Sequence, residues 1–509
     1  MYSKVKTCVL QGLNGFTVEV ETDISNGLPT FTIVGLPDIS IKESKERVRT
    51  AIKNSGYQFP LKRITINLAP ANIKKEGSQI DLAIAIGMLA AMDVINRYNF
   101  SNISFVGELA LDGKVNKIEG ALPMIISLRE KGIKNIVIPY ENRDECGIIQ
   151  DINIIPVKNL NQLVRFLNGQ EKINFYKRDV KNSLSSNESM EKDFSDIKGQ
   201  EGLKRALEVA AAGFHNIIII GPPGSGKTMS SERLPTILPN LTFEESIETT
   251  KIYSVAGLLN KDSLINKRPF RSPHHTASSS SLIGGGRVPK PGEVSLAHNG
   301  VLFLDELPEF QKNVLEALRQ PIEDGNVTIS RVNATLTYPS KFMLVASMNP
   351  CPCGYLGDPY HECTCTTNSI NKYLGKISHP LLDRIDIHIE VMPVEYSDLR
   401  KDTKTESSQD IRTRVDRARE IQLERYYNKN IFSNGQLTSK GVKEYCRLNN
   451  KANKIMKQAF EKFKFSARSY NKILKVGRTI ADLDGEEKIK ENHILEAIQY
   501  RSLDKKYWG

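Results

Sequence analysis

Apolar and polar residues in the first third of the chain alternate with the period of strands in some segments and of helices in others. Period-2 or continuous apolar character predicts strands at 17–24, 29–35, 63–70 and 135–140. The segment 40–56 has the spacing of an amphipathic helix, and the apolar segment 81–92 predicts a buried helix. A further hairpin is predicted to turn at Asp112-Gly113. Residues 1–165 are therefore expected to form a mixed α/β domain.

The pattern divides the remainder of the chain into three segments. Residues 166–192 are polar without apolar periodicity, which is typical of a linker. Residues 193–395 alternate strands and helices around a glycine-rich loop, which predicts a parallel sheet flanked by helices. Residues 396–509 have helical spacing and predict a helical lid on that core. We expect no membrane span, because no apolar run reaches about 18 residues, and a cytoplasmic location, because the N-terminus lacks a signal-peptide pattern.

The glycine-rich loop at 221–228 lies between an apolar strand and a helix, which is the context that a phosphate-binding loop requires. Its glycines let the backbone wrap around phosphates, and Lys227 is placed to reach the β- and γ-phosphates of ATP. Thr228 offers a hydroxyl to Mg²⁺. The predicted ATP-binding residues of the loop are Gly221, Pro222, Pro223, Gly224, Ser225, Gly226, Lys227 and Thr228.

Two later apolar strands end in polar side chains that suit hydrolysis. The first, at 301–307, ends in Asp305 and Glu306. Asp305 is predicted to hold Mg²⁺ through water, and Glu306 is predicted to polarise the attacking water. The second strand ends in Asn349, whose amide can orient that water from a neighbouring strand. An acidic strand end or a turn-forming asparagine before proline is common by itself, but the order of these motifs after the loop favours catalysis.

Two arginines and one upstream segment complete the candidate site. Arg384 is predicted to direct its guanidinium at the γ-phosphate of a neighbouring subunit. Arg468, at the start of a lid helix, is predicted to contact the phosphates of its own subunit. Either arginine alone would more often form a surface ion pair. Their order along the chain, after the phosphate loop and the two strand ends, favours a role in catalysis. Plausible purine contacts just upstream of the phosphate strand are Ile197, Gly199 and Gln200.

The formal net charge of +11 favours a polyanionic partner such as DNA. A β-hairpin is predicted over 325–342, with Arg331 and Asn333 near its tip, and a plain surface hairpin is the alternative. A glycine-rich loop carries Arg287 and Lys290, which suits phosphate tracking without sequence readout, and a structural insertion is the alternative. The adjacent His274 and His275 are expected to face opposite ways on a strand, so a shared metal site is not expected, and the two are interpreted as structural or pore-facing.

Four of the seven cysteines fall within fifteen residues, as two closely spaced pairs. They are Cys351, Cys353, Cys363 and Cys365. Four thiolates at this spacing predict a tetrahedral zinc site, although CxC is tighter than the usual CxxC, and His361 is a spare ligand. Reduced free thiols are the alternative. The loop would connect the predicted sensor, Asn349, with the predicted finger, Arg384.

Taken together, the motifs resemble those of the YifB/ComM family of magnesium-chelatase-like AAA+ ATPases over essentially the whole chain. The segments that carry the resemblance are FTIVGLPD, GPPGSGKT, RPFRSPHHTAS, GEVSLAHNGVLFLDELPEF, LRQPIEDG, ASMNPCPCGY, LLDRIDIH and RTIADLDG. The resemblance implies an AAA+ parallel-sheet core with a helical lid and a ring-shaped homohexamer. For ComM-type members it implies a DNA helicase that drives branch migration. It also implies that Arg384 is the arginine finger acting in trans and Arg468 the sensor arginine acting in cis.

The N-terminal segment resembles the Lon protease domain, an α+β domain with a ribosomal-S5-like fold, through FVGELALDGKVNKIEGALPMI and GIKNIVIPYENRDE. A Lon-type protease needs a serine nucleophile and a lysine base within hydrogen-bond reach. In this chain the nucleophile position holds Gln79, with Ser78 adjacent, and the lysine position holds Leu122. We therefore expect a degenerate, non-proteolytic scaffold.

Three functions follow from these observations. The leading hypothesis is an ATP-hydrolysing DNA motor or helicase that promotes branch migration in homologous recombination or natural transformation. A magnesium-chelatase motor subunit is a second hypothesis, although such subunits lack the Lon-like domain. An ATP-gated scaffold or regulator of recombination is the third, and strand-displacement activity would separate it from the first.

Overall fold

The computed structural model describes residues 1–96, 102–179, 192–259, 264–286, 289–331, 334–394, 405–429 and 431–508. The predicted contact residues Arg287 and Asn333 lie outside these ranges. The chain divides into two units, each of which is described separately. The first contains residues 1–186 and 243–266, and the second contains residues 187–242 and 267–509. No helix of the described residues is both long and apolar enough to cross a membrane.

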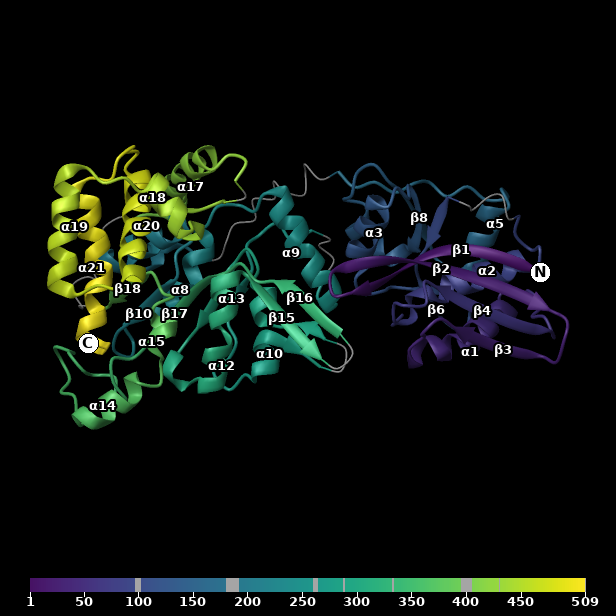
Figure 1. The fold of residues 1–509 in the computed structure, drawn as a ribbon, viewed down its shortest axis with the longest axis horizontal. Coiled ribbons are helices and arrows are strands. Elements are labelled where there is room, and N and C mark those ends of the chain that lie inside the picture. The colour runs from purple at the N-terminus through teal and green to yellow at the C-terminus, as the bar shows by residue number, and fades with distance from the viewer. Residues whose placement is uncertain are drawn as a thin grey trace. The chain divides into compact units, whose positions relative to one another are not determined.

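The first unit is built on a seven-stranded mixed sheet in the order β3-β4-β2-β1-β5-β8-β9 (Figure 1). Its strands are β1 (Tyr2–Gln11), β2 (Asn14–Ser25), β3 (Thr30–Val34), β4 (Arg63–Ala69), β5 (Ile103–Phe105), β8 (Asn135–Pro139) and β9 (Asn153–Val157). Antiparallel pairs join β1 to β2 and β2 to β4, and the remaining neighbours are parallel. The mixed sheet confirms the α/β prediction, although the sequence did not predict its strands β1, β5 and β9.

The helices of the first unit follow their local sequence signals. They are α1 (Ile39–Asn54), α2 (Asp81–Ala91), α3 (Ala121–Glu130), α4 (Arg143–Cys146), α5 (Leu160–Leu167) and α9 (Phe243–Ala256). The carboxylate of Asp38 caps α1 by accepting from the backbone N–H of Ile41 at 2.8 Å. Every residue of α2 is buried, as its nearly continuous apolar sequence predicts. The short strands β6 (Glu108–Leu109) and β7 (Val115–Asn116) form the hairpin predicted to turn at Asp112-Gly113.

Helix α9 belongs to the first unit although it interrupts the second in sequence. The backbone N–H of Gly120 donates to the carbonyl of Ser254 at 3.0 Å. The Ser254 hydroxyl donates to the buried carboxylate of Glu145 at 3.0 Å. Burial raises the pKa of Glu145. The segment 193–395, expected to form one core domain, is therefore divided between the two units, because α9 and Leu264 bury apolar side chains among those of α3.

The second unit contains a five-stranded sheet in the order β11-β14-β17-β10-β18, and every neighbouring pair is parallel. Its strands are β10 (Ile217–Ile220), β11 (Phe270–Arg271), β14 (Val301–Leu304), β17 (Met343–Met348) and β18 (Ile387–Glu390). All residues of β10, β14 and β17 are buried, because helices cover both faces of the sheet. The order confirms the predicted parallel sheet, and it aligns the carboxyl ends of the strands at one edge.

Helices cover this sheet and build the predicted helical lid. They are α7 (Glu201–Gly213), α8 (Lys227–Arg233), α10 (Ser279–Ile283), α11 (Glu293–Leu296), α12 (Lys312–Ala317), α13 (Arg319–Asp324), α14 (Thr367–Leu374), α15 (His379–Leu382), α17 (Ser408–Arg425), α18 (Ser439–Tyr445), α19 (Asn450–Phe463), α20 (Ala467–Leu483) and α21 (Glu491–Trp508). Two hairpins project from the unit. One is β12 (Gly284–Gly285) with β13 (Lys290–Pro291), and the other is β15 (Asn326–Arg331) with β16 (Ala334–Pro339).

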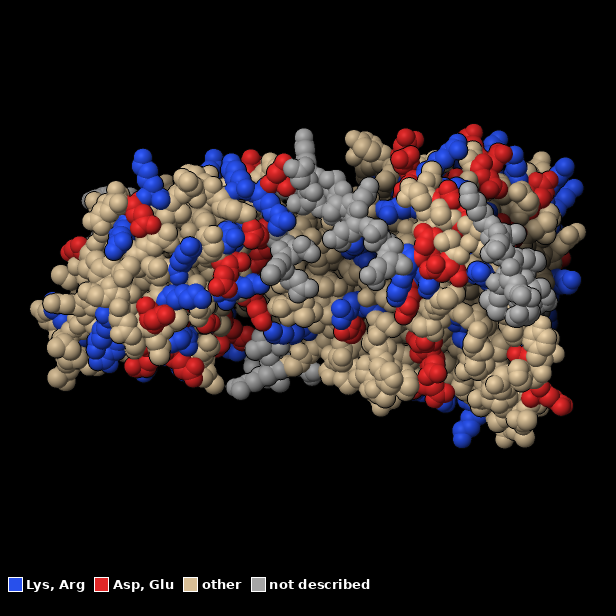
Figure 2. All heavy atoms as spheres, turned by 180° about the vertical axis from the view of Figure 1, so that it is seen from behind, with Lys and Arg blue, Asp and Glu red and all other residues tan. Residues whose placement is uncertain are grey.

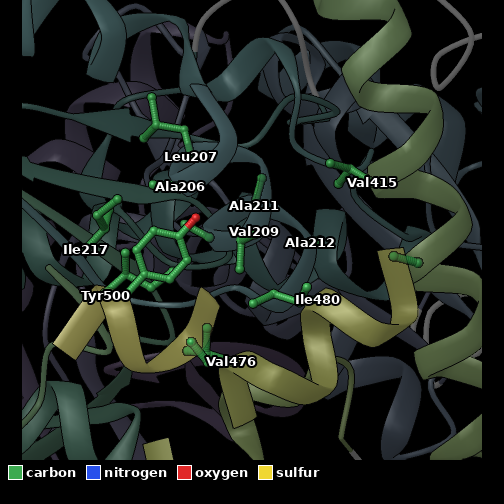
Figure 3. Close-up of a cluster of buried hydrophobic side chains, with 14 of the residues drawn as sticks. Ala206, Leu207, Val209, Ala211, Ala212, Ile217, Val415, Val476, Ile480 and Tyr500 are labelled. Atoms are coloured by element: carbon green, nitrogen blue, oxygen red, sulfur yellow. The ribbon is translucent and has the colours of Figure 1, made fainter. Parts of the chain in front are cut away.

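The lid shares one core with the sheet rather than forming a separate body. Figure 3 shows Val476 and Ile480 of α20 and Tyr500 of α21 directed toward the apolar face of α7. Each fully buried side chain of this size contributes about 1.5–3 kcal/mol relative to an exposed one. The same core contains Val415 of α17 and Ile217 of β10. The angle between lid and sheet is therefore fixed by packing within one chain.

A buried ion pair also joins the lid to the sheet. The Nζ of Lys472 in α20 lies 3.2 Å from the carboxylate of Asp386, just before β18, and donates to the carbonyl of Ile385 at 3.0 Å. Burial alone would raise the pKa of Asp386, but Lys472 and the adjacent His215 hold it well below its usual range. Burial lowers the pKa of Lys472 to about 8. The pair holds the start of α20 at the amino end of the sheet.

Candidate nucleotide-hydrolysis site

The phosphate loop follows β10 directly and turns through two glycines with positive φ, Gly224 at 75° and Gly226 at 83°. Lys227 is the first residue of α8, and its Nζ donates to the carbonyls of Gly221 at 2.7 Å and Pro222 at 2.8 Å. Burial lowers the pKa of Lys227 to about 8. The ammonium group thus lies folded into its own loop, where a bound phosphate can take over from the two carbonyls.

Thr228 and Asp305 meet beside the loop, as a site for a hydrated Mg²⁺ requires. The Thr228 hydroxyl donates to Oδ2 of Asp305 at 2.8 Å. The hydroxyl of Ser347 donates to the other carboxylate oxygen. Since β14 and β17 are parallel neighbours, Asp305 at the end of one lies beside Ser347 near the end of the other. Two hard oxygen donors therefore stand where the resemblance places Mg²⁺.

Glu306 lies next to Asp305 but turns away from the strand. Its backbone is left-handed, with φ 53°, and its side chain is more than half exposed at 55%. The Nδ1 of His275 lies 3.6 Å from Oε2 of Glu306, close enough for an ion pair but too long for a hydrogen bond. An exposed carboxylate beside bound ATP is free to accept a proton from water.

The two histidines after β11 lie side by side, which contradicts the prediction that they face opposite ways. The segment after β11 leaves the strand and turns, so the rings of His274 and His275 stack with centroids 4.1 Å apart instead of facing opposite ways. His274 bonds to Thr276, with Nδ1 and Oγ1 2.9 Å apart, which leaves His275 beside Glu306. His275 lies near Glu306 because β11 pairs with β14 in the sheet, and the sequence carries no signal for this pairing.

Asn349 follows β17 and faces the phosphate loop. Its Oδ1 accepts a hydrogen bond from Lys227 Nζ at 3.2 Å. Its backbone N–H bonds to the hydroxyl oxygen of Tyr373 in α14, whose pKa is raised by burial. The structure therefore brings together Lys227, Thr228, Asp305, Glu306 and Asn349, five of the residues predicted for catalysis and ATP or Mg²⁺ binding.

The proposed purine segment also reaches the loop. Ile197 is buried, and Gly199 and Gln200 both have positive φ, which brings the chain into α7 through a tight turn. Gln200 Nε2 donates to the carbonyl of Met392 at 2.5 Å. The preceding residue, Val391, lies so close to Gly221 that a Cβ on this glycine would meet its carbonyl oxygen at 2.5 Å. The segment therefore lies near the phosphate loop, with only the residues that follow β18 between them.

Arg384 and Arg468 lie together, at the other end of the sheet. Both line a cavity of about 660 Å³ that also includes Asn216, which precedes β10. Arg384 pairs with Glu323 and donates to Pro380, while its buried Nε has no hydrogen-bond partner in the described structure. This placement differs from the expectation that Arg468 contacts the phosphates of its own chain. The reason is that α20 begins at the amino end of the sheet, whereas the phosphate loop lies at the carboxyl end.

The four clustered cysteines converge immediately after Asn349. The Sγ of Cys351 lies 3.4 Å from that of Cys353 and 3.7 Å from that of Cys363, and all four sulfurs lie within 4.8 Å of one another. The backbone N–H of Cys353 donates to the sulfur of Cys365 at 3.3 Å. Backbone N–H groups, first that of Tyr355, lower the pKa of Cys353 to about 6. His361 is not part of the cluster, because it contacts Asp358.

The candidate DNA-contacting elements are described only in part. Arg331 closes β15, but its side chain falls outside the described residues, whereas Lys290 is exposed on β13. The buried Tyr338 of β16 donates its hydroxyl to the carbonyl of Pro289 at 2.8 Å, which ties the two hairpins together. On the face shown in Figure 2, lysines and arginines are interspersed with acidic side chains.

The Lon-like positions in the first unit carry no serine–lysine pair. Gln79 donates its side-chain amide to the carbonyl of Glu76 at 2.7 Å, and Leu122 is fully buried. The adjacent Ser78 donates its hydroxyl to the carboxylate of Glu108. A serine bonded to an acid has no base beside it of the type that the Lon mechanism uses.

Known proteins match this chain over nearly its whole length. Family models described as magnesium chelatase subunit ChlI, subunit ChlI of Mg-chelatase, and the ChlI C-terminal region match residues 193–399, 20–142 and 405–501. The competence protein ComM of Haemophilus influenzae is 44% identical over 497 residues, covering 97% of this chain and 96% of its own. The uncharacterized protein YifB of Escherichia coli is 41% identical over 505 residues, covering 99% and 97%. Lon protease 2 of Bacillus subtilis is 32% identical over 124 residues, covering 24% of this chain and 22% of its own. The chain therefore belongs to the YifB/ComM family of magnesium-chelatase-like AAA+ ATPases.

Proposed function

We propose that this protein is an ATP-hydrolysing motor that moves DNA, working in the cytoplasm. The observation that carries the proposal is the assembly of Lys227, Thr228, Asp305, Glu306 and Asn349 at the carboxyl edge of one sheet. Lys227 would exchange its carbonyl partners for the β- and γ-phosphates, and Asn349 would hold the lysine in that direction. Mg²⁺, held by Thr228 and through water by Asp305, would neutralise phosphate charge. Glu306 would accept the proton of the attacking water.

The position of the arginines supports a ring rather than a monomer. Arg384 and Arg468 line a cavity at the amino ends of the strands, away from the phosphate loop of the same chain. Five cationic side chains and four carboxylates line the cavity, and Lys472 is already paired with Asp386. A neighbouring chain that presents its ATP to this cavity would complete both sites. We therefore infer a closed homo-oligomer, with a hexamer as the expected size, in which both arginines act on the neighbour's nucleotide.

DNA is proposed as the substrate of the ring for two reasons. A relative that matches nearly the full length carries the name competence protein ComM. The hydrogen bond from Tyr338 to Pro289 joins the hairpin of β15 and β16, which carries Arg331, to the hairpin of β12 and β13, which carries Lys290. Hydrolysis that shifts one hairpin would thus move the other, as a DNA-translocating device requires. The specific proposal is a helicase that promotes branch migration during recombination or natural transformation.

A magnesium-chelatase motor is the second candidate, and one comparison favours it. The 38 kDa magnesium-chelatase subunit of Rhodobacter capsulatus is 25% identical over 174 residues, which covers 31% of this chain. A family model described as subunit ChlI of Mg-chelatase also matches residues 20–142 in the first unit, so the Lon-like unit does not by itself separate the two functions. A non-motor scaffold for recombination shares the ATP site and differs only in producing no strand movement.

We also infer that the four cysteines hold zinc. Four sulfurs bound at about 2.3 Å to a central tetrahedral ion lie about 3.8 Å apart. The separations of 3.4, 3.6 and 3.7 Å match this arrangement, and they greatly exceed the length of a disulfide bond, about 2.05 Å. The backbone N–H groups that point at the Cys353 sulfur lower the pKa of this thiol and stabilise its thiolate, the form that binds metal.

The test of the DNA motor is ATP turnover with and without single-stranded and forked DNA, with Glu306→Gln as the control. Stimulation by DNA together with displacement of a labelled strand supports the motor. Stimulation without displacement would support the scaffold. A rate that DNA leaves unchanged would exclude both and favour the chelatase-type motor. The zinc proposal is tested separately, by elemental analysis of the purified protein for bound zinc. The two proposals can therefore be refuted independently.

A further inference from the structure

The cysteine cluster lies on a short path between two parts of the ATP site. Cys351 follows Asn349 by two residues, and Cys365 is followed almost at once by α14. Tyr373, near the end of α14, bonds to the backbone N–H of Asn349 through its hydroxyl oxygen. The chain therefore leaves Asn349, passes through all four cysteines and returns to Asn349. A metal bound by these sulfurs would close the loop at its base.

The same cluster lies directly against the phosphate loop. Gly354 follows Cys353 and has a φ of 89°. A Cβ at this position would meet the Pro223 ring at 2.6 Å and the Asn349 side chain at 3.9 Å. Because real Cβ contacts are not this short, the backbone of the cysteine turn packs on Pro223 as closely as only glycine permits. Pro223 belongs to the loop whose carbonyls accept hydrogen bonds from Lys227.

We propose that the zinc-bound cysteine cluster is a brace for the phosphate loop, which holds Pro223 and Asn349 in the positions that ATP requires. The inference rests on the zinc site proposed above and extends it from a structural ion to a positioning device. Through Pro223 the brace fixes the wall of the phosphate loop. Through Asn349 it fixes the amide that receives Lys227.

Chain entropy and charge both make the order of this loop depend on a bound ion. Without a central ion, the sulfurs of Cys351, Cys353 and Cys363 gain little from lying within 3.7 Å of one another, and ionised thiolates at this distance repel. The loop of residues 351–365 then gains conformational freedom, and the segments on either side of it, Asn349 and α14, become less ordered. Asn349 and Pro223 lose their support together. ATP binding should weaken more than the fold does, since the sheet and the α7 core do not depend on this loop.

The experiment compares three variants of the full chain. Cys363→Ser/Cys365→Ser removes two sulfurs from the exposed side of the cluster. Gly354→Ala leaves all four cysteines in place and disturbs only the contact with Pro223. His361→Ala is the matched control, because this side chain lies in the same loop and outside the cluster. Each variant is measured for zinc per chain, circular dichroism, dissociation constant for a fluorescent ATP analogue, and KM and kcat for ATP.

We expect wild type and His361→Ala to hold one zinc per chain with equal ATP affinity. The double serine variant should lose zinc, keep its circular dichroism, and bind ATP about tenfold more weakly. Gly354→Ala should keep zinc and still raise the dissociation constant severalfold, because the contact and not the ion reaches the nucleotide. The change should appear mainly in KM, since Glu306 and Asp305 are untouched.

The outcomes separate the brace from the proposals on which it rests. A zinc-free double variant with wild-type ATP affinity would overturn the brace even though zinc binding stands. Wild-type protein without zinc would overturn the zinc site itself. If the double variant fails to fold, Gly354→Ala decides, and an unchanged dissociation constant there refutes the brace. DNA enters none of these measurements, so failure of the DNA-motor proposal would leave their interpretation intact.

Discussion

The buried lysine of the phosphate loop gives ATP affinity a specific pH dependence. In the nucleotide-free protein, burial lowers the pKa of Lys227 from 10.5 to about 8. Phosphate oxygens are bound by the ammonium form and not by the neutral amine. A bound triphosphate raises the lysine pKa again, so binding requires the uptake of a proton wherever the amine is neutral. Affinity is therefore fully present below pH 8 and is lost as the pH rises through that value.

The size of the effect follows from the two-state titration of Lys227. With a pKa of about 8, roughly nine-tenths of the chains carry the ammonium form at pH 7 and roughly one-tenth at pH 9. The apparent dissociation constant for MgATP should thus rise about tenfold over this range, a change of about 1.4 kcal/mol. A lysine with the ordinary pKa of 10.5 would stay charged, and the same constant would change by only a few per cent. The phosphates of ATP do not interfere, because a terminal phosphate titrates near pH 6.

Equilibrium titration with a fluorescent ATP analogue at several pH values between 7 and 9 measures this dependence. Lys227→Arg is the control, because a guanidinium stays charged over the whole range. The arginine variant will bind less tightly at pH 7, since its fork does not fit the carbonyls of Gly221 and Pro222, but its affinity should not vary with pH. An equal slope in the wild type and the arginine variant, or a flat wild-type profile, would refute the role assigned to Lys227.

Three further predictions concern catalysis, the hairpins and the lid. Glu306→Gln should keep MgATP affinity within about twofold and reduce turnover by about 100-fold or more, measured by phosphate release, because the amide accepts no proton; turnover near wild type would remove Glu306 as the base. Tyr338→Phe should increase hydrogen exchange at the backbone amides of β12 and β13 about fivefold, because one buried hydrogen bond to Pro289, worth about 1 kcal/mol, is lost; unchanged protection would mean that the hairpins are not coupled. Asp386→Asn should destabilise the second unit by about 3–5 kcal/mol, because it leaves the amine of Lys472 buried without its partner. Thermal unfolding measures this loss, and adding Lys472→Met should restore most of it; a double variant no more stable than the single one would contradict the pairing.

Local sequence predicted which polar side chains lie at the carboxyl edge of the sheet. The loop at 221–228, Asp305 and Asn349 each follow an apolar strand, and parallel strands bring their carboxyl ends together whatever the order of the sheet. Period-2 patterns likewise found β2, β3 and β4. These successes share one reason, which is that the signal and the structure both lie within a few residues.

Placement across the fold was less accessible from sequence. Helix α9 has few markers that assign it to the first unit, because its partner α3 lies more than a hundred residues earlier. The stacking of His274 on His275 depends on a turn after a two-residue strand, which periodicity cannot detect. The sequence predicted that the four cysteines cluster, but their packing on Pro223 became evident only in the fold, through the close contact at Gly354.

By itself, the sequence determined which reaction the protein is equipped for, since glycines, a lysine and paired carboxylates at fixed spacing can cradle and hydrolyse a triphosphate. It did not determine which end of the sheet each arginine occupies. The tertiary structure decided this, because a shared apolar core and the pair of Lys472 with Asp386 hold α20 at the amino end. Burial among side chains distant in sequence sets that orientation, and it is what places Arg468 beside Arg384 and away from the phosphate loop of its own chain.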